Sequence, residues 1–173
     1  TYNVAIGDNT GKAITTGVNS TLIGGLAGDA ITTANNNVAV GKSALSTETS
    51  GANCTAIGSN ALAAQNVGSG TNVANTAVGY DAGLAVTTGI NNVLIGAYAG
   101  DALTDADDNV AIGKDALGSD TLGSKSIAIG QGSLLNQNLT TATDAHNVCV
   151  GHATGNQITT GVRNVMIGGL AGD

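Results

Sequence analysis

The 173-residue sequence contains no proline, phenylalanine or tryptophan, and its only aromatic residues are three tyrosines. A compact globular domain of this length usually builds its core around bulky side chains, so we expect a fold with a thin core. Charge is also scarce, since Lys, Arg, Asp and Glu make up 10% of the residues and the net charge is −7. This acidic balance disfavours nucleic acids and anionic membrane surfaces as partners.

No apolar run in the sequence is long enough to cross a bilayer, so we expect no membrane insertion. Two cysteines, Cys54 and Cys149, are too few for a disulfide framework or a zinc site. The carboxylates are scattered and do not form the pairs that glycoside hydrolases use, and no phosphate-binding glycine loop is recognisable. We therefore predict no enzyme activity, no cofactor and no metal site.

Glycine, in contrast, is abundant, and ten of the 27 glycines follow a small apolar triplet at regular spacing. Their sequence numbers rise in steps of 17, 17, 17, 21, 17, 17, 17, 21 and 17, so three short steps and a long one make a larger repeat. Each step is one coil of a repeat protein, and the coils form groups of four. These glycines are Gly7, Gly24, Gly41, Gly58, Gly79, Gly96, Gly113, Gly130, Gly151 and Gly168.

A period of this length has room for about two strands and two turns. Helical repeats need more than about 30 residues and tolerate this much glycine poorly. We therefore predict an all-β fold, a parallel β-solenoid of about ten coils that forms a rod roughly 45–50 Å long. Residues 1–173 form one solenoid segment in this interpretation, and we expect it to be a fragment of a longer fibre, because the sequence starts and stops within a repeat.

The triplet before each glycine suggests how copies of the chain associate. Its two outer positions are β-branched in every coil, and its middle position is never polar. A strand that is apolar on both faces is normally covered on both sides. The solenoid interior covers one face, and we expect another copy of the chain to cover the other, with a monomer that exposes this stripe as the alternative. The predicted oligomer-interface stripe consists of the middle residues: Ala5, Leu22, Ala39, Ala56, Ala77, Leu94, Ala111, Ala128, Cys149 and Met166.

Two positions in the second half of the coil vary together. Where the position four after the glycine is Gly, the position seven after it is aliphatic, as in Gly28 and Ile31. Where the first is Leu, the second is polar, as in Leu45 and Glu48. Protein interiors tolerate neither a void nor an overfilled space, so the pattern predicts one core slot per coil that is filled from either position.

Two polar ladders run along the predicted rod, a Thr-rich one in the second half of each coil and an Asn-rich one just before the strand. Stacked Thr and Asn side chains can satisfy backbone groups in turns, and we take this structural role as the main interpretation. The Thr ladder also leaves open an alternative function, an ice-binding solenoid, although the rank beside it is mostly glycine.

The two longer coils carry additional residues within 66–75 and 138–147, which we call the long loops. Long loops on a rigid scaffold are common binding sites, so we predict receptor contacts here, with tolerated decoration as the alternative. The candidate receptor-contact residues are Asn66, Ser69, Thr71, Asn72, Asn138, Thr140, Thr141, Thr143 and Asp144.

The phrases "NNVLIGAYAG", "DNVAIGKDAL" and "KSIAIGQGSL" resemble the repeats of trimeric autotransporter adhesin heads, and "TGVNSTLIGGLAG" and "TGINNVLIGAYAG" resemble repeats of bacteriophage tail fibres even more closely. The resemblance covers the whole chain, although adhesin coils are shorter than the coils of this sequence. It implies a left-handed parallel β-roll that forms a parallel homotrimer. It also implies an extracellular location, on a virion tail fibre or a bacterial cell surface, and attachment to a host-surface glycan or protein receptor. A passive shaft without a ligand is the remaining alternative.

Overall fold

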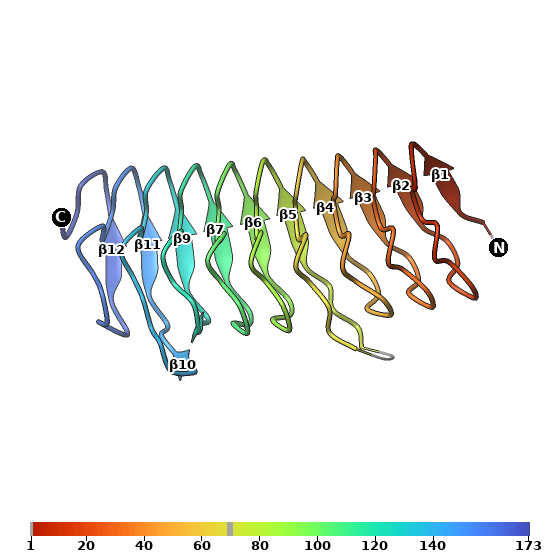
Figure 1. Cartoon of the computed structure of the whole chain (residues 1–173). Helices are drawn as coiled ribbons and strands as arrows, with labels where there is room; N and C mark the ends of the chain where they lie inside the picture. The colour runs from red at the N-terminus through yellow and green to blue at the C-terminus, as the bar shows by residue number, and fades with distance from the viewer. Residues whose placement is uncertain (1, 69–70) are drawn as a thin grey trace.

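The computed structural model describes residues 2–68 and 71–173. The chain is a parallel β-solenoid in which each coil gives one strand to a ten-stranded sheet (Figure 1). The prediction of an all-β solenoid of about ten coils is therefore confirmed. In sheet order the strands are β1 (Val4–Ile6), β2 (Thr21–Ile23), β3 (Val38–Val40), β4 (Thr55–Ile57), β5 (Thr76–Val78), β6 (Val93–Ile95), β7 (Val110–Ile112), β9 (Ile127–Ile129), β11 (Val148–Val150) and β12 (Val165–Ile167).

The strand register follows the sequence period without a slip. Ala77 of β5 pairs with Leu94 of β6, and Leu94 pairs with Ala111 of β7. Ala56 of β4 pairs with Ala77 in the same way, although the longer of the two intervals separates them. The additional residues of the long coils therefore leave the rod as loops and do not disturb the sheet.

Each coil gives the main sheet a single short strand, whereas the period has room for two strands. Much of the remaining backbone turns at positions with positive φ, for example at Asn36 (φ 59°) and Leu45 (φ 53°). Such conformations bend the chain and prevent a second extended strand. The only other strands in the described residues are the short β8 (Gly123–Ser124) and β10 (Thr143–Asp144), which pair with each other.

Glycine is required where successive coils approach most closely. Gly58 has a φ of 135°, and a Cβ atom on it would overlap the carbonyl oxygen of Gly79. The same contact recurs two coils earlier, where a Cβ on Gly24 would lie 2.6 Å from the oxygen of Gly41. This column of backbone contacts explains why the glycine after the strand is present in every coil.

The middle residue of each strand faces the interior of the solenoid. Leu22, Leu94 and Cys149 are 0% exposed, and so are the stripe alanines from Ala39 to Ala128. Only Ala5 and Met166, in the first and last coils, keep some exposure. The prediction that this stripe contacts another copy is therefore wrong, because the chain's own coils cover it. The stripe concerned is Ala5, Leu22, Ala39, Ala56, Ala77, Leu94, Ala111, Ala128, Cys149 and Met166.

The physical reason is the narrowness of the interior. A Cβ atom on Gly83 would lie 2.7 Å from a methyl group of Leu94 and 2.9 Å from one of Leu62. Alanine fits this space, and Leu94 fits because Gly83 and Gly100 leave room for it. The bulkier β-branched residues on either side of the middle position face outward.

The prediction of one core slot per coil holds for the aliphatic residues, since Ile31 is 1% exposed and Leu45 is 0% exposed. The polar residues that accompany Leu are not displaced to the surface, however. Glu48 and Asp120 are 0% exposed, as are Gln65 and Gln137. The slot in these coils therefore holds both the leucine and a buried polar group.

The Asn ladder has the structural role that its sequence position predicts. Asn92 Nδ2 donates to the carbonyl oxygen of Ala106 at 2.7 Å, and its Oδ1 accepts from the backbone N–H of Asn109 at 2.9 Å. Asn92 and Asn109 are fully buried. Each such side chain thus satisfies backbone groups of the neighbouring turn and of the next coil.

Candidate functional site

The first candidate surface is the outer face of the ten-stranded sheet. It consists of the first and third residues of every strand, and we call it the outer sheet face. The third position is Ile or Val in all ten strands, whereas the first is Thr in three. Side chains in the middle of the rod remain accessible, since Ile57 is 39% and Ile95 is 37% exposed. The first positions are Val4, Thr21, Val38, Thr55, Thr76, Val93, Val110, Ile127, Val148 and Val165, and the third are Ile6, Ile23, Val40, Ile57, Val78, Ile95, Ile112, Ile129, Val150 and Ile167.

The long loops are the second candidate surface, and both extend beyond the line of the other coils at the same edge of the rod (Figure 1). In the first loop, Asn72 forms a parallel bridge with Ala52 of the preceding coil, and its Oδ1 accepts from Asn53 Nδ2 at 2.7 Å. Asn72 remains exposed, whereas Val73 beside it is fully buried. The predicted contact residue Ser69 lies outside the described residues.

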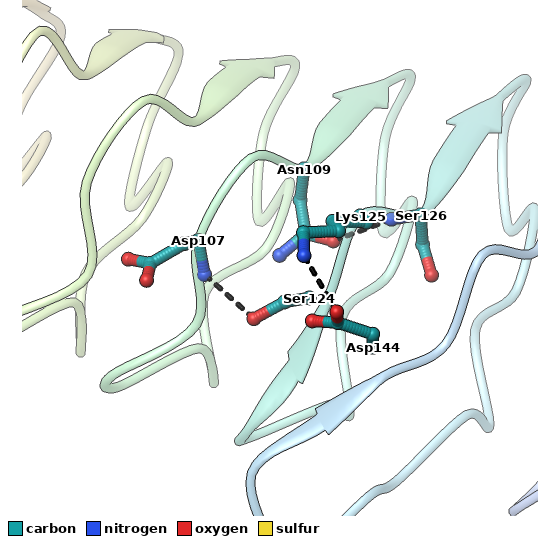
Figure 2. A network of polar contacts seen from close by, with 6 residues as sticks. All are labelled: Asp107, Asn109, Ser124, Lys125, Ser126 and Asp144. Atoms are coloured by element: carbon teal, nitrogen blue, oxygen red, sulfur yellow. Dashed lines mark hydrogen bonds and ion pairs between the residues drawn. The ribbon is translucent and has the colours of Figure 1, made fainter.

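The second long loop is fastened by strand β10, which pairs in parallel with β8 of the preceding coil. Lys125 follows β8, and its Nζ donates to Asp144 Oδ2 at 2.5 Å (Figure 2). This hydrogen bond lowers the pKa of the Asp144 carboxyl below its ordinary value. The loop therefore presents a charged pair together with the hydroxyl groups of Thr140 and Thr141, which are exposed.

The structure separates the predicted contact residues into two groups. Asn72, Thr140, Thr141 and Asp144 are exposed on the loops, and Thr71 and Thr143 are half-buried. Asn66 and Asn138 are exposed as well, but they lie at the loop bases, where the oxygen of each side chain accepts a hydrogen bond from a threonine of the preceding coil. The two loops lie four coils apart, roughly 19 Å, so they form two patches and not one site.

The Thr ladder uses its hydroxyl groups within the chain. Thr32 Oγ1 donates to the carbonyl oxygen of Thr49 at 3.0 Å, and Thr104 Oγ1 donates to that of Thr121 at 3.1 Å. The ladder also lies in turns and not on the strands of the sheet. Both observations argue against a flat, free rank of hydroxyl groups of the kind that ice binding requires.

A pair of exposed tyrosines is a surface feature that the sequence analysis did not single out. The rings of Tyr80 and Tyr98 pack edge to face with centroids 5.4 Å apart, and Lys114 Nζ lies 5.8 Å from the centre of the Tyr98 ring. Tyr80 is 50% exposed. The two tyrosines are one coil plus one position apart in the sequence, and this spacing is the signal that could have predicted their contact.

The two cysteines lie in the interior of the rod. Cys54 and Cys149 are buried and unpaired, and burial raises the pKa of the Cys54 thiol to about 11. Within residues 2–68 and 71–173, no three His, Cys, Asp or Glu side chains are arranged to hold a metal ion. No helix in that part of the chain is long and apolar enough to span a membrane.

Comparison of the chain with protein-family models, with curated proteins and with solved structures finds no match. The chain is a β-solenoid repeat protein, and its two candidate surfaces are the basis on which a function can be inferred.

Proposed function

We propose that this β-solenoid is a structural segment of an extracellular attachment fibre. Copies of the chain associate side by side through the outer sheet face, and the long loops face outward from the assembly. The largely aliphatic outer sheet face, whose side chains are half-buried or exposed, is the observation that carries this proposal.

The outer sheet face is unusual for a surface that remains in water. Nine steps of about 4.8 Å, and three residues of about 3.3 Å each, give a flat area of roughly 400 Å². A largely apolar area of this size is comparable with the largest patches on ordinary monomers, and such patches mark interaction sites. The face carries no charged residue, and only Thr21, Thr55 and Thr76 are polar on it.

A second copy of the chain is the partner that fits this face best. The face keeps the same register over ten coils, so a parallel copy presents rows of the same length and spacing. Because the surface is apolar and uncharged, two such faces meet without burying an unpaired charge. Burial of each exposed Val or Ile side chain stabilises the assembly by about 25 cal/mol per Å² of apolar area.

The stoichiometry and the location in this proposal come from the resemblance of the repeats to phage tail fibres and adhesin heads. Three parallel chains around one axis would cover the three sheet faces together. Such an assembly belongs on a virion or a bacterial surface. The long loops, with exposed hydroxyl, amide and carboxylate groups, then contact a host-surface glycan or protein. A passive shaft that carries no ligand is the competing function.

Charge introduced on the outer sheet face tests the proposal. In the double variant Ile95→Lys/Ile112→Lys, two ammonium groups lie in the middle of the proposed interface. We expect the wild-type chain to sediment as an oligomer and this variant as a folded monomer of 16.6 kDa. A wild-type monomer, or a double variant that remains assembled, would contradict the proposal.

The matched control is Asn91→Lys, which adds the same kind of charge to a turn. Lys125 occupies the equivalent turn position with a φ of 62°, and Asn91 has a φ of 59°, so the backbone accepts lysine there. This variant should keep the sedimentation mass of the wild type.

A further inference from the structure

Four coils carry a polar residue in the core slot, and these are the coils at the bases of the two long loops. Glu48 and Gln65 lie in the third and fourth coils, and Asp120 and Gln137 lie in the seventh and eighth. All four side chains are 0% exposed. Because a buried carboxylate or amide is costly unless it is hydrogen-bonded, these four residues need a specific reason to be there. The other coils fill the same position with Ile14, Ile31, Val86, Leu103 and Ile158.

The partners of Glu48 and Gln65 supply that reason for the first loop. Glu48 Oε1 accepts from the backbone N–H of Gly51 at 2.7 Å. Its Oε2 accepts from Gln65 Nε2 at 3.2 Å and from the N–H of Val67 at 3.4 Å. Gln65 Oε1 accepts from Asn75 Nδ2 at 2.8 Å. Val67 lies at the start of the loop and Asn75 at its end, so the buried pair binds both ends.

The second loop is held by the same arrangement at the corresponding place in the next group of four coils. Asp120 Oδ1 accepts from the backbone N–H of Leu139 at 2.8 Å, and Oδ2 accepts from Gln137 Nε2 at 2.5 Å. Gln137 Oε1 accepts from Asn147 Nδ2 at 2.7 Å. The loop is again bound at its start and its end, although the carboxylate comes from Asp in place of Glu.

Further contacts fix the part of the loop between its ends. Leu139 is 7% exposed and Ala145 is 0% exposed, so the second loop inserts an apolar residue at each base. On the outside, β10 pairs with β8, and Lys125 binds Asp144 (Figure 2). These contacts favour a loop that is held in place over a tolerated insertion, which needs none of them.

We propose that the buried pairs Glu48–Gln65 and Asp120–Gln137 are positioning residues, which hold the two ends of each long loop in place and so present the loops as equivalent contact elements. A loop that is already ordered loses less conformational entropy when it binds a partner. Only the description of the loops as contact elements rests on the proposed function. The holding of the loops is a separate claim and is tested without any host ligand.

Amide hydrogen exchange followed by mass spectrometry tests this claim on the full chain. Glu48→Ala removes the acceptor of the first buried pair. The loop can then open without breaking these buried hydrogen bonds, so peptides covering residues 66–75 should exchange about tenfold faster or more. Residues 138–147 should be unaffected. Asp120→Ala should give the reverse pattern, with faster exchange in residues 138–147 only.

Two further variants separate positioning from simple loss of core packing. Leu103→Ala empties the same core slot in a coil without a long loop, and it should leave both loops protected. Glu48→Gln keeps one accepting oxygen, but its NH2 group faces N–H donors in either orientation, so it should restore only part of the protection. If Glu48→Ala does not fold, Gln65→Met provides the same test, because it keeps the length of the side chain but cannot bind Asn75.

The proposal is overturned if Glu48→Ala, or Gln65→Met in its place, folds and residues 66–75 still exchange at the wild-type rate. An equal response of both loops to a change in one pair would overturn it as well, because each pair is proposed to hold only its own loop.

Discussion

The outer sheet face and the loop-bearing edge of this solenoid differ in how regularly they are built. The outer sheet face keeps the same largely aliphatic character through all ten strands, from Val4 to Ile167. The loop-bearing edge changes in only two coils, and there it carries exposed polar residues such as Asn72 and Thr140 on buried polar supports. A repeated surface is suited to self-association along the rod, whereas a local departure from the repeat is suited to recognition.

The largest expected effect on stability comes from introducing a carboxylate on the inner face of a strand, compared with the same change on its outer face. Leu94 faces the interior and is 0% exposed, whereas its neighbour Ile95 is 37% exposed on the outer sheet face. Leu94→Asp places a carboxylate in a narrow apolar core, and we expect it to lower the free energy of unfolding by about 3–5 kcal/mol.

Ile95→Asp is the matched change on the outer sheet face. It should leave the coil folded and remove only the stabilisation that assembly supplies, which is the smaller loss. Urea unfolding followed by circular dichroism measures both variants. Equal destabilisation by the two substitutions would mean that the faces are not distinguished as the structure shows.

The same strand shows how much of the fold the sequence predicts. The positions of the ten glycines are sufficient to predict the solenoid, the number of coils and the register, because each repeat must stack on the next. They do not show which face of the strand points inward. Both faces are apolar, so polarity cannot decide between Leu94 and Ile95. Local space decides it, because the interior accepts alanine at most middle positions and takes Leu94 only where Gly83 and Gly100 leave room for it.

The loops show a second limit of sequence-based prediction. Their place in the repeat follows from the two longer intervals, and the exposure of Asn72 and Thr140 agrees with their predicted position on a loop. The burial of Glu48 and Gln65 could not be predicted in this way, because polar residues are usually exposed. Their hydrogen-bond partners, Val67 and Asn75 among them, become apparent only when the coils are stacked.

A deletion at the loop-bearing edge should have a moderate effect. Removing residues 140–143 shortens the second long coil to the length of the ordinary coils. Because the sheet register does not depend on these residues, we expect a loss of about 1–2 kcal/mol in stability, from the lost β8–β10 pairing and packing at the base. Urea unfolding measures the loss, and the sedimentation mass should be unchanged.

The matched control is deletion of residues 87–90, which removes the same number of residues from a coil of ordinary length. That change moves Asn91 and Asn92 out of the Asn ladder and should prevent folding.

An array of bacterial surface polysaccharides can compare binding by the variant that lacks residues 140–143 with binding by the wild type. Loss of binding in the loop deletion supports a contact role, equal binding places the contact outside this loop, and no binding by either protein favours the passive shaft.

The smallest expected effect concerns the ion pair on the second loop. Lys125 holds the pKa of Asp144 below its ordinary value of 3.8. Because the pKa of Asp144 is lower in the folded state than in the unfolded state, its carboxylate stabilises the fold at pH values above the unfolded-state pKa. This contribution is lost as the pH falls through the folded-state pKa. Lys125→Ala should therefore raise the pKa of Asp144 toward 3.8, with little change in stability at pH 7, because both groups are exposed. An NMR titration of the Asp144 carboxyl carbon measures the shift, and an unchanged pKa would show that the ion pair does not form in solution.

Sedimentation equilibrium of the wild-type chain at micromolar concentration tests the central claim most directly. If copies pack on the outer sheet face, the measured mass is an integral multiple of the 16.6 kDa chain mass, and a threefold value agrees with the proposed trimer. A single species of 16.6 kDa would mean that the row from Ile6 to Ile167 remains in contact with water, and it would contradict the account.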